Sequence, residues 1–345
     1  MSWSIGLSVA AALVASLLLT LLVRARALAR GVLDIPNERS SHYTPVPRGG
    51  GAAIVVVGMI AFAALALTGR MPPRVAAALL GGGLAVAGIG YLDDRRSVSP
   101  AIRLVVHLIA ATWAIAWLGG LPPIRLGAHT IAMGYVGDIV AVLGLVWALN
   151  LFNFMDGIDG IAAAEGVFMC AGWAVLALAG KAEVTLVSAA VLFASACSGF
   201  LVLNWAPAKI FMGDVGSGFV GYVIATLALA SATANSVALL IWLILGAVFV
   251  ADATLTLFRR LLRGESPHKA HRSHAYQSLA RRWGSHRRVT TAVTVVNIGW
   301  LLPNAWFAAE YPARAGWVLL VAIVPVIAMA AVAGAGSAAG EARTH

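Results

Sequence analysis

The sequence predicts an all-α polytopic integral membrane protein with about 10–11 transmembrane helices. Of its 345 residues, 61% are hydrophobic and only 11% are charged, which is far from the usage of soluble globular proteins. The apolar residues form continuous runs long enough to cross a bilayer as helices, without the alternation that marks the strands of a transmembrane barrel. Eleven such runs are predicted, at 3–23, 50–68, 75–92, 101–118, 135–152, 161–179, 184–203, 216–233, 237–258, 289–308 and 314–334.

The chain is expected to form a single transmembrane domain over 1–345, because it shows no internal repeat and no soluble segment of domain size. The first run is interpreted as an uncleaved span, since its arginines follow the apolar segment instead of preceding it. Cys170 and Cys197 lie in separate runs without metal-type spacing, which favours a packing role for both. Residues 119–134, which include Pro122, Pro123 and Gly127, are expected to form a small hairpin between two spans.

Basic residues indicate the orientation. With the N-terminus placed outside, 19 of the 24 Lys and Arg residues lie on or just inside one side of the membrane. The positive-inside rule makes that side cytoplasmic. The formal charge of +10 is thereby explained by topology, anionic lipid and phosphates, and no nucleic-acid partner is expected. The cytoplasmic loops are predicted at 24–49, 93–100, 153–160, 204–215 and 259–288.

Polar residues recur at the ends of the predicted spans on this side. Asn150, Asn153, Asp156 and Asp159 follow one another at intervals of three, which places them roughly on one face of a helix. A glycine follows each aspartate and frees the backbone to break that helix. Carboxylates between two spans are costly, so this stretch is predicted to be functional.

A second acidic group lies at the end of the third run. Asp93 and Asp94 are adjacent and repel one another, which indicates contact with a cation or substrate, although ion pairs with Arg95 and Arg96 are an alternative. Arg103 lies in the first turn of the next span, where a cation opposes the helix dipole. This placement is reasonable if Arg103 faces an anion.

Two glycine-rich helix starts offer places for phosphate. Arg48 precedes Gly49–Gly51, and free amides there would suit a phosphate; the alternative is an ordinary connector whose small residues ease helix packing. Asp214 precedes a second such start, 216–218. Its carboxylate is interpreted either as a helix cap or as a Mg²⁺ ligand beside amides that receive phosphate oxygens. Lys209 lies nearby in the same loop.

The loop 259–288 carries histidines and an amphipathic pattern. Apolar residues from Tyr276 onward follow helical spacing, with His271 and His274 at the predicted helix start. A zinc pair is conceivable, but the loop lacks further ligands, so phosphate contact together with Arg272 is preferred. Asp252, inside the preceding span, is interpreted as functional or as an ion-pair partner of the arginines that follow it.

In this order, the clusters resemble the polyprenyl-phosphate N-acetylhexosamine-1-phosphate transferase superfamily, glycosyltransferase family 4. The resemblance extends from residue 34 to about residue 288. Each motif is moderately specific alone, and the ordered set is strongly specific. The matching motifs are Asp34-x-Pro36-Asn37 through Pro47-Arg48-Gly-Gly50, Asp93-Asp94 with Ser99-Pro100-x-x-Arg103, Asn153-x-x-Asp156-Gly-x-Asp159-Gly, and Pro207-Ala-x-x-Phe211-x-Gly213-Asp214-x-Gly216-Ser217.

The resemblance implies transfer of a sugar-1-phosphate, of the N-acetylhexosamine type, from a UDP-sugar to undecaprenyl phosphate with release of UMP. It implies Mg²⁺, with Mn²⁺ as an alternative, in a bacterial cytoplasmic membrane with the active site facing the cytoplasm, and it allows a homodimer. Asp214 and Asn153 match the metal site. Catalytic roles are expected for Asp93, Asp94, Asp156 and Asp159, and substrate binding for Arg48, Arg103, Asn153, Lys209, His271, Arg272 and His274.

The family's last loop often carries a His-x-His-His run, where this chain reads His271-Arg-Ser-His274. This departure is similar to the branch that initiates O-antigen or related surface glycans, within lipopolysaccharide synthesis of the cell envelope. The phospho-MurNAc-pentapeptide translocase is the alternative within the family. A secondary transporter is the alternative from another class, but its carboxylates would lie near the bilayer midplane and not at span ends.

Charge suggests how such a transfer proceeds. The phosphomonoester of the lipid has a second pKa near about 6, so it is mostly a dianion at neutral pH. A general base is then needed only weakly. Asp93 and Asp94 are accordingly expected to position groups, or to link to the metal, at least as readily as they act as bases, and direct attack is favoured over a covalent intermediate.

Overall fold

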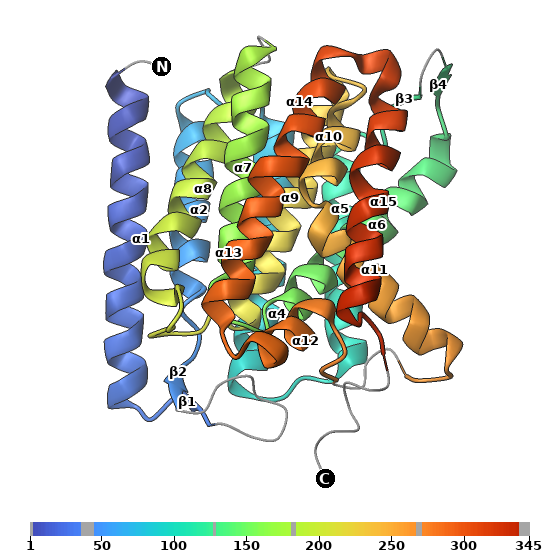
Figure 1. The fold of residues 1–345 in the computed structure, drawn as a ribbon. Coiled ribbons are helices and arrows are strands. Elements are labelled where there is room, and N and C mark those ends of the chain that lie inside the picture. Colours follow the sequence, from blue (N-terminus) through green and yellow to red (C-terminus); the bar gives the residue numbers. More distant parts are fainter. Residues whose placement is uncertain (1–2, 36–44, 127–128, 181–183, 267–270, 338–345) are drawn as a thin grey trace.

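The computed structural model describes residues 3–35, 45–126, 129–180, 184–266 and 271–337, and it confirms the all-α membrane fold. Within these ranges, nine helical segments are long and apolar enough to cross a membrane, and they stand roughly side by side (Figure 1). They are α1 (Trp3–Ala29), α3–η1–α4 (Pro73–Ala77, Ala78–Gly82, Gly83–Arg95), α5 (Pro100–Leu118), α6 (Gly134–Met155), α7 (Ile161–Ala179), α8 (Val184–Asn204), α9 (Asp214–Ala234), α13–η2–α14 (His286–Val296, Asn297–Leu301, Leu302–Glu310), and η3–α15 (Pro312–Arg314, Ala315–Ala333).

Two predicted spans differ from expectation. The run 50–68 forms α2 (Ala52–Leu67), which is shorter than the other spans. The run 237–258 is divided into α10 (Ala238–Leu245) and α11 (Ala247–Leu262), bent by 73° at Gly246. The prediction of one continuous span there is wrong. A Cβ at Gly246 would lie 2.8 Å from Met169 Cε, the tip of a flexible side chain, so the break is a point of close packing.

Helix α9 is the centre of the bundle. Of its most apolar stretch, 94% is buried, whereas α1, α5 and α15 expose large aliphatic side chains outward, as lipid-facing helices do. Helices α4 and α6 pack against α9. Glycine permits this packing, because a Cβ at Gly221 would lie 2.5 Å from the carbonyl oxygen of Ala148 in α6. The start of α9 is thereby fixed between the ends of α4 and α6.

Short elements close both ends of the bundle. Strands β1 (Leu33–Asp34) and β2 (Val46–Pro47) pair antiparallel at the end where α4 and α6 finish, and α12 (Ala275–Trp283) lies at the same end (Figure 1). At the opposite end, β3 (Ile124–Leu126) and β4 (His129–Ile131) confirm the predicted hairpin. Helix α12 confirms the predicted amphipathic segment, since Ala275, Tyr276 and Ala280 are buried.

Candidate active site

The adjacent carboxylates of α4 point to different partners. Asp93 accepts hydrogen bonds from the Val98 amide (2.7 Å) and from Arg103 Nη1 (2.6 Å), which joins α4 to the start of α5. Asp94 accepts from the amides of Asp214 (3.0 Å) and Val215 (3.1 Å), the first residues of α9. Asp94 therefore caps α9 from another helix. The alternative of local ion pairs is not what is seen: the Arg95 guanidinium lies over the Tyr91 ring at 4.4 Å.

Both predicted amide cradles for phosphate are wrong. At the start of α9, two amides donate to Asp94, and those of Gly216 and Ser217 donate to the Gly213 carbonyl. At the start of α2, the Gly50 and Gly51 amides donate to the carbonyls of the loop before α9, both at 2.9 Å. A Cβ at Gly51 would lie 2.4 Å from Gly216 Cα, so these glycines let the two helix starts touch, which is the packing alternative.

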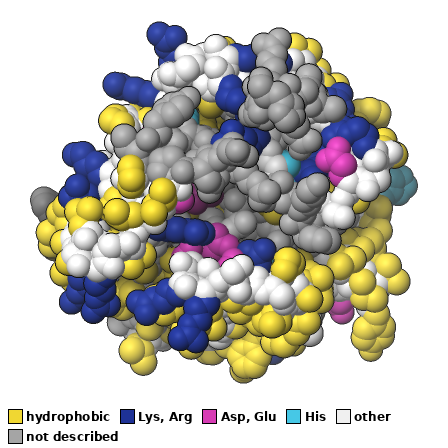
Figure 2. Space-filling view, turned by 90° about the horizontal axis from the view of Figure 1, so that it is seen from below, with side chains coloured by type: hydrophobic (Ala, Val, Ile, Leu, Met, Phe, Trp, Pro, Cys, Tyr) yellow, Lys and Arg dark blue, Asp and Glu magenta, His cyan; other side chains and the backbone are white. Residues whose placement is uncertain are grey.

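Two arginines bridge three carboxylates. Arg48 Nε lies 3.0 Å from Asp94 and its Nη2 lies 3.2 Å from Asp214, while Arg103 Nη1 reaches both Asp93 and Asp214, the latter at 3.1 Å. Burial acts to lower the pKa of Arg48, but the charges of Asp94 and Asp214 outweigh it and raise that pKa. Viewed from this end of the bundle, acidic side chains lie near the middle of the face with basic side chains around them (Figure 2).

Asp156 is the predicted carboxylate that makes no direct ion pair among the described residues, although the charge of Arg48 acts to lower its pKa. It directly follows α6, and within the described residues no hydrogen bond or ion pair is made to its side chain. Burial raises the pKa of Asp156 well above its ordinary value, and the charge of Asp214 raises it further. Asn153, one turn before, donates from Nδ2 to Ser217 Oγ (3.1 Å), which leaves its Oδ1 available as an acceptor. A cavity of about 40 Å³ lies between Asn153, Asp214 and Arg103.

These oxygens suit a divalent cation of the Mg²⁺ class. In the part of the chain that is described, no three acidic, histidine or cysteine side chains form a complete cage. Mg²⁺, however, is ordinarily held by one or two carboxylates, with substrate phosphates and waters completing the shell. The Asp214 carboxylate and the Asn153 amide oxygen, which line the same cavity, would fit such a partial set, and a cation near Asp156 would offset the effect of burial on its carboxyl.

Asp159 is used by the protein itself. Its carboxylate lies 3.1 Å from His286 Nδ1 and accepts from the Ala208 amide (3.0 Å), while its carbonyl accepts from Thr290 Oγ1 (2.9 Å). It therefore ties the loop between α6 and α7 to the loop before α9 and to α13. Lys209 is not brought into the cluster: its side chain is exposed, and among the described contacts it makes no ion pair with a carboxylate.

The histidine loop is fixed through Asp252. His274 caps α12, which begins at Ala275, so both histidines precede the helix. Asp252, buried in α11, accepts from the amides of Ala275 (2.9 Å) and Tyr276 (3.0 Å), and lies 3.3 Å from His274 Nδ1. Its partners are thus the start of α12, in place of the expected arginines. The His271 ring lies 5.0 Å from that of His274, and the Arg281 side chain donates to the carbonyl of neighbouring Arg272.

Tyr276 joins this loop to the aspartate motif. Its hydroxyl donates to the carbonyl of Phe154 (2.8 Å). A Cβ at Gly157 would lie 2.1 Å from the hydroxyl oxygen of Tyr276. The glycine after Asp156 therefore makes room for Tyr276. Sequence reasoning identified Tyr276 only as an apolar helix position and gave no role to His286. A tyrosine within an otherwise apolar stripe was the one available signal, since its hydroxyl needs a partner when buried.

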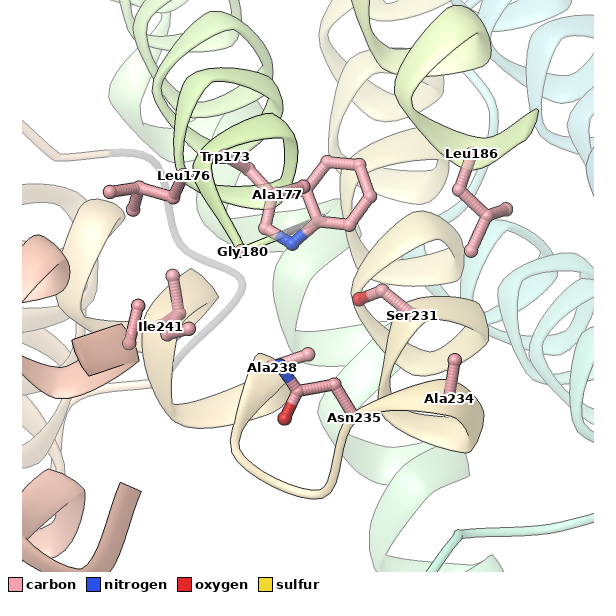
Figure 3. A pocket seen from close by; sticks show the side chains of 11 residues that line it. Trp173, Leu176, Ala177, Gly180, Leu186, Ser231, Ala234, Asn235, Ala238 and Ile241 are labelled. Carbon is pink, nitrogen blue, oxygen red and sulfur yellow. The ribbon is translucent and has the colours of Figure 1, made fainter. Parts of the chain in front are cut away.

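A second cavity, of about 150 Å³, lies at the far end of α9 and is lined by Trp173, Ser231 and Asn235 among others (Figure 3). Since α9 has 21 residues, about 30 Å of helix separates this cavity from Asp214. It is therefore separate from the polar cluster.

Comparison with known proteins places this arrangement in a family. Residues 76–232, which include Asp93, Asp94, Asp156 and Asp214, match the model of glycosyl transferase family 4. A Bacillus subtilis (strain 168) protein named "Probable undecaprenyl-phosphate N-acetylglucosaminyl 1-phosphate transferase" is 31% identical over 291 residues, covering 81% of this chain and 78% of that protein. The chain belongs to glycosyl transferase family 4.

Other members of the family agree with this assignment. The Mycobacterium tuberculosis (strain ATCC 25618 / H37Rv) "Decaprenyl-phosphate N-acetylglucosaminephosphotransferase" is 32% identical over 301 residues, covering 79% of this chain and 74% of its own. The Escherichia coli (strain K12) "Undecaprenyl-phosphate alpha-N-acetylglucosaminyl 1-phosphate transferase" is 27% identical, with 84% and 80% covered. The resemblance predicted from the motifs is confirmed, which favours a transferase over the secondary transporter.

Proposed function

We propose that this protein transfers an N-acetylhexosamine 1-phosphate from a UDP-sugar to a polyprenyl phosphate, undecaprenyl phosphate in the first instance, and releases UMP. The observation that carries the proposal is the group of two arginines and three carboxylates at the start of α9, together with Asp156, whose carboxylate makes no direct ion pair among the described residues. Such a group provides cations for phosphates and oxygens for a divalent metal. The names of the relatives support a polyprenyl phosphate as the acceptor and an N-acetylglucosamine phosphate as the transferred group.

Repulsion between phosphates is the main barrier that the site has to lower. Arg48 and Arg103 hold carboxylates in the absence of substrate, and both lie where they can exchange these partners for phosphate oxygens. Mg²⁺ held by Asp214, Asp156 and Asn153 would supply further positive charge to the phosphates when it is bound. Asp93 keeps Arg103 in place, because its carboxylate oxygen lies 2.6 Å from Arg103 Nη1.

The chemistry is a direct displacement. An oxygen of the lipid phosphate attacks the sugar-linked phosphorus, the bond from that phosphorus to the oxygen bridging the two phosphates breaks, and UMP leaves with that oxygen. The attacking phosphate is mostly ionised above about pH 6, so no side chain has to take a proton from it. Consistent with this, both oxygens of Asp94 are occupied by backbone amides of α9.

An apolar cavity within the bundle offers a place for the lipid chain. A cavity of about 310 Å³ lies between α6, α9, α10 and α11, and its walls include Leu151, Phe152 and Phe249. The walls are almost wholly apolar, which suits an isoprenoid chain. A chain in this cavity would run along the bundle from Leu151 and Phe152, near the end of α6, toward Leu121 and Ile124 at the hairpin end.

Activity of the purified protein tests the proposal. The protein is incubated with undecaprenyl phosphate, Mg²⁺ and a panel of UDP-sugars that includes UDP-N-acetylglucosamine and UDP-MurNAc-pentapeptide, and UMP release is measured. We expect release with an N-acetylated hexosamine donor that depends on the lipid phosphate. Release only with the pentapeptide donor would favour the translocase alternative, and no release with any donor would contradict the proposed function.

The active site is proposed to face the cytoplasm of a bacterial inner membrane, with surface glycan synthesis of the O-antigen kind as the process served. Two exposed residues provide reporters for the two sides of the membrane. Ser97 lies beside the acidic pair, and Thr68 lies at the end of α2 that is farther from the site. An impermeant maleimide added to intact cells should label Thr68→Cys and spare Ser97→Cys until the cells are broken. Labelling of Ser97→Cys in intact cells would reverse the proposed orientation.

Asp252→Asn is expected to reduce both stability and UMP release. The amide group of Asn puts an NH₂ where one oxygen now accepts a backbone N–H of α12, and a buried donor left unpaired costs about 1–3 kcal/mol. Thermal unfolding and initial rates measure the two effects. Asp138→Asn is the matched control, because Asp138 accepts from the Leu121 amide at the opposite end of the bundle. If Asp252→Asn released UMP as fast as this control, Asp252 would have no role in the site.

A further inference from the structure

The segment that follows α15 returns to the histidine loop. Ala335 is fully buried, and the amide of Gly336 donates to the carbonyl of Ser273 at 2.6 Å, between His271 and His274. Ala335 packs with Ala275, the first residue of α12, in a small apolar cluster completed by Ala330 and Ala333 of α15. The chain after the last span therefore contacts the loop that is expected to receive the substrate.

The same segment is held by α11. Arg259 Nη1 donates to the Ala335 carbonyl at 2.8 Å, and Arg263 Nη1 donates to the Gly336 carbonyl. Both carbonyls are thus bound to guanidinium groups, and hydrogen bonds to charged donors are about twice as strong as neutral ones. These basic residues were counted as topology signals in the sequence, and here they bind the backbone of the segment after α15.

Gly336 has to be glycine for this contact. Its φ of +66° lies in the left-handed region, and a Cβ there would lie 2.9 Å from Arg259 Cβ and 3.1 Å from the Thr256 backbone. Any side chain would push the segment away from α11 and weaken the bond to Ser273.

We propose that Ala335 and Gly336 are positioning residues, which fix the backbone of His271–Ser273 so that the loop can hold the donor. The loop is then anchored to α11 at two points. Asp252 holds the start of α12, and the segment after α15 holds Ser273 from the other side. The proposal rests on the proposed function only for the identity of the donor, since the anchoring itself is independent of any reaction.

Loss of the second anchor leaves the first one in place. Asp252 keeps its bonds to Ala275 and Tyr276, so α12 and the fold are retained while His271–Ser273 loosens. Such local opening affects the binding of the donor more than the unfolding temperature. We expect the KM for the UDP-sugar to rise about tenfold and the KM for the lipid phosphate to stay the same, since the loosened loop is proposed to hold the donor and not the lipid.

The experiment compares two forms of the protein in detergent, the full chain and a chain that ends at Ala333. Both carry Ser273→Cys as a reporter, because Ser273 is 2% exposed and the natural Cys170 and Cys197 are buried within spans. Alkylation by a water-soluble maleimide should be slow in the longer chain and about tenfold faster in the shorter one. UMP release is measured in parallel on the same two chains without the reporter.

The outcomes are separable. Equal alkylation rates in the two chains would overturn the anchoring, and faster alkylation with an unchanged KM for the UDP-sugar would overturn the positioning role. If the full chain releases no UMP with any donor, the proposed function fails while the alkylation assay still decides the anchoring. Should the chain ending at Ala333 not fold, Gly336→Val in the full chain takes its place, with Ser337→Val as the matched control.

Discussion

Asp214→Asn is expected to lower the rate of UMP release by about 10³-fold while the protein stays folded. The Asp214 carboxylate is shared by Arg48 and Arg103, at 3.2 and 3.1 Å, and it lines the same cavity as Asn153, where the two can hold a divalent cation. Asn keeps the shape of the side chain but carries no charge. The rate is therefore expected to fall because the negative charges of the two substrates are less well neutralised when they come together in the site.

The fold of this variant should survive, because the contact that fixes the start of α9 uses the backbone of Asp214. Its amide donates to Asp94, and this bond does not depend on the side chain. Initial rates are measured across a Mg²⁺ titration, with thermal unfolding as the test of folding and Asp138→Asn as the control. Near-normal turnover with an ordinary Mg²⁺ dependence would remove Asp214 from the metal site.

The helices were predictable because a bilayer requires long apolar segments whatever their neighbours are. The break at Gly246 was not, since hydropathy measures how apolar a run is and not which way it points. The run 237–258 has the composition of one span, yet α11 turns by 73° and brings Asp252 to the start of α12. Such a bend depends on tertiary packing, and at this break Gly246 lies close to Met169.

The carboxylates of the site could be predicted because a charged residue at a membrane span is energetically costly, but the partners of these carboxylates could not be predicted. A charged residue in an apolar region is visible in the sequence, but its partner is determined by the fold. Asp94, for example, accepts a hydrogen bond from the amide of Asp214, which is 120 residues away in the chain. The glycine patterns misled for a related reason. Glycine at a helix start predicts that another group approaches the backbone closely. At Gly51 this group is the backbone of Gly216 and not a phosphate.

Replacing Asp94 by Asn tests whether the acidic pair removes a proton or holds the site together, and we expect a loss of about 100-fold. Asp94 uses both oxygens on the first amides of α9 and a third contact on Arg48. Asn offers one oxygen where two are needed and cannot pair with Arg48. The start of α9, and with it Asp214, would then shift relative to Asn153.

The dependence of this loss on pH distinguishes the two roles. If Asp94 were mainly a base, its removal would matter less as the lipid phosphate ionises by itself, so the loss would shrink as pH rises well above about 6. A positioning group is missed equally at every pH, and we therefore expect the ratio of wild-type to variant rates to stay flat from about pH 6 to pH 9. Asp93→Asn should follow the same flat profile, because Asp93 acts through Arg103. Recovery of either variant toward the wild-type rate at high pH would restore the general-base role and would require a second orientation of the carboxylate, free of the amides and guanidinium groups that hold it here.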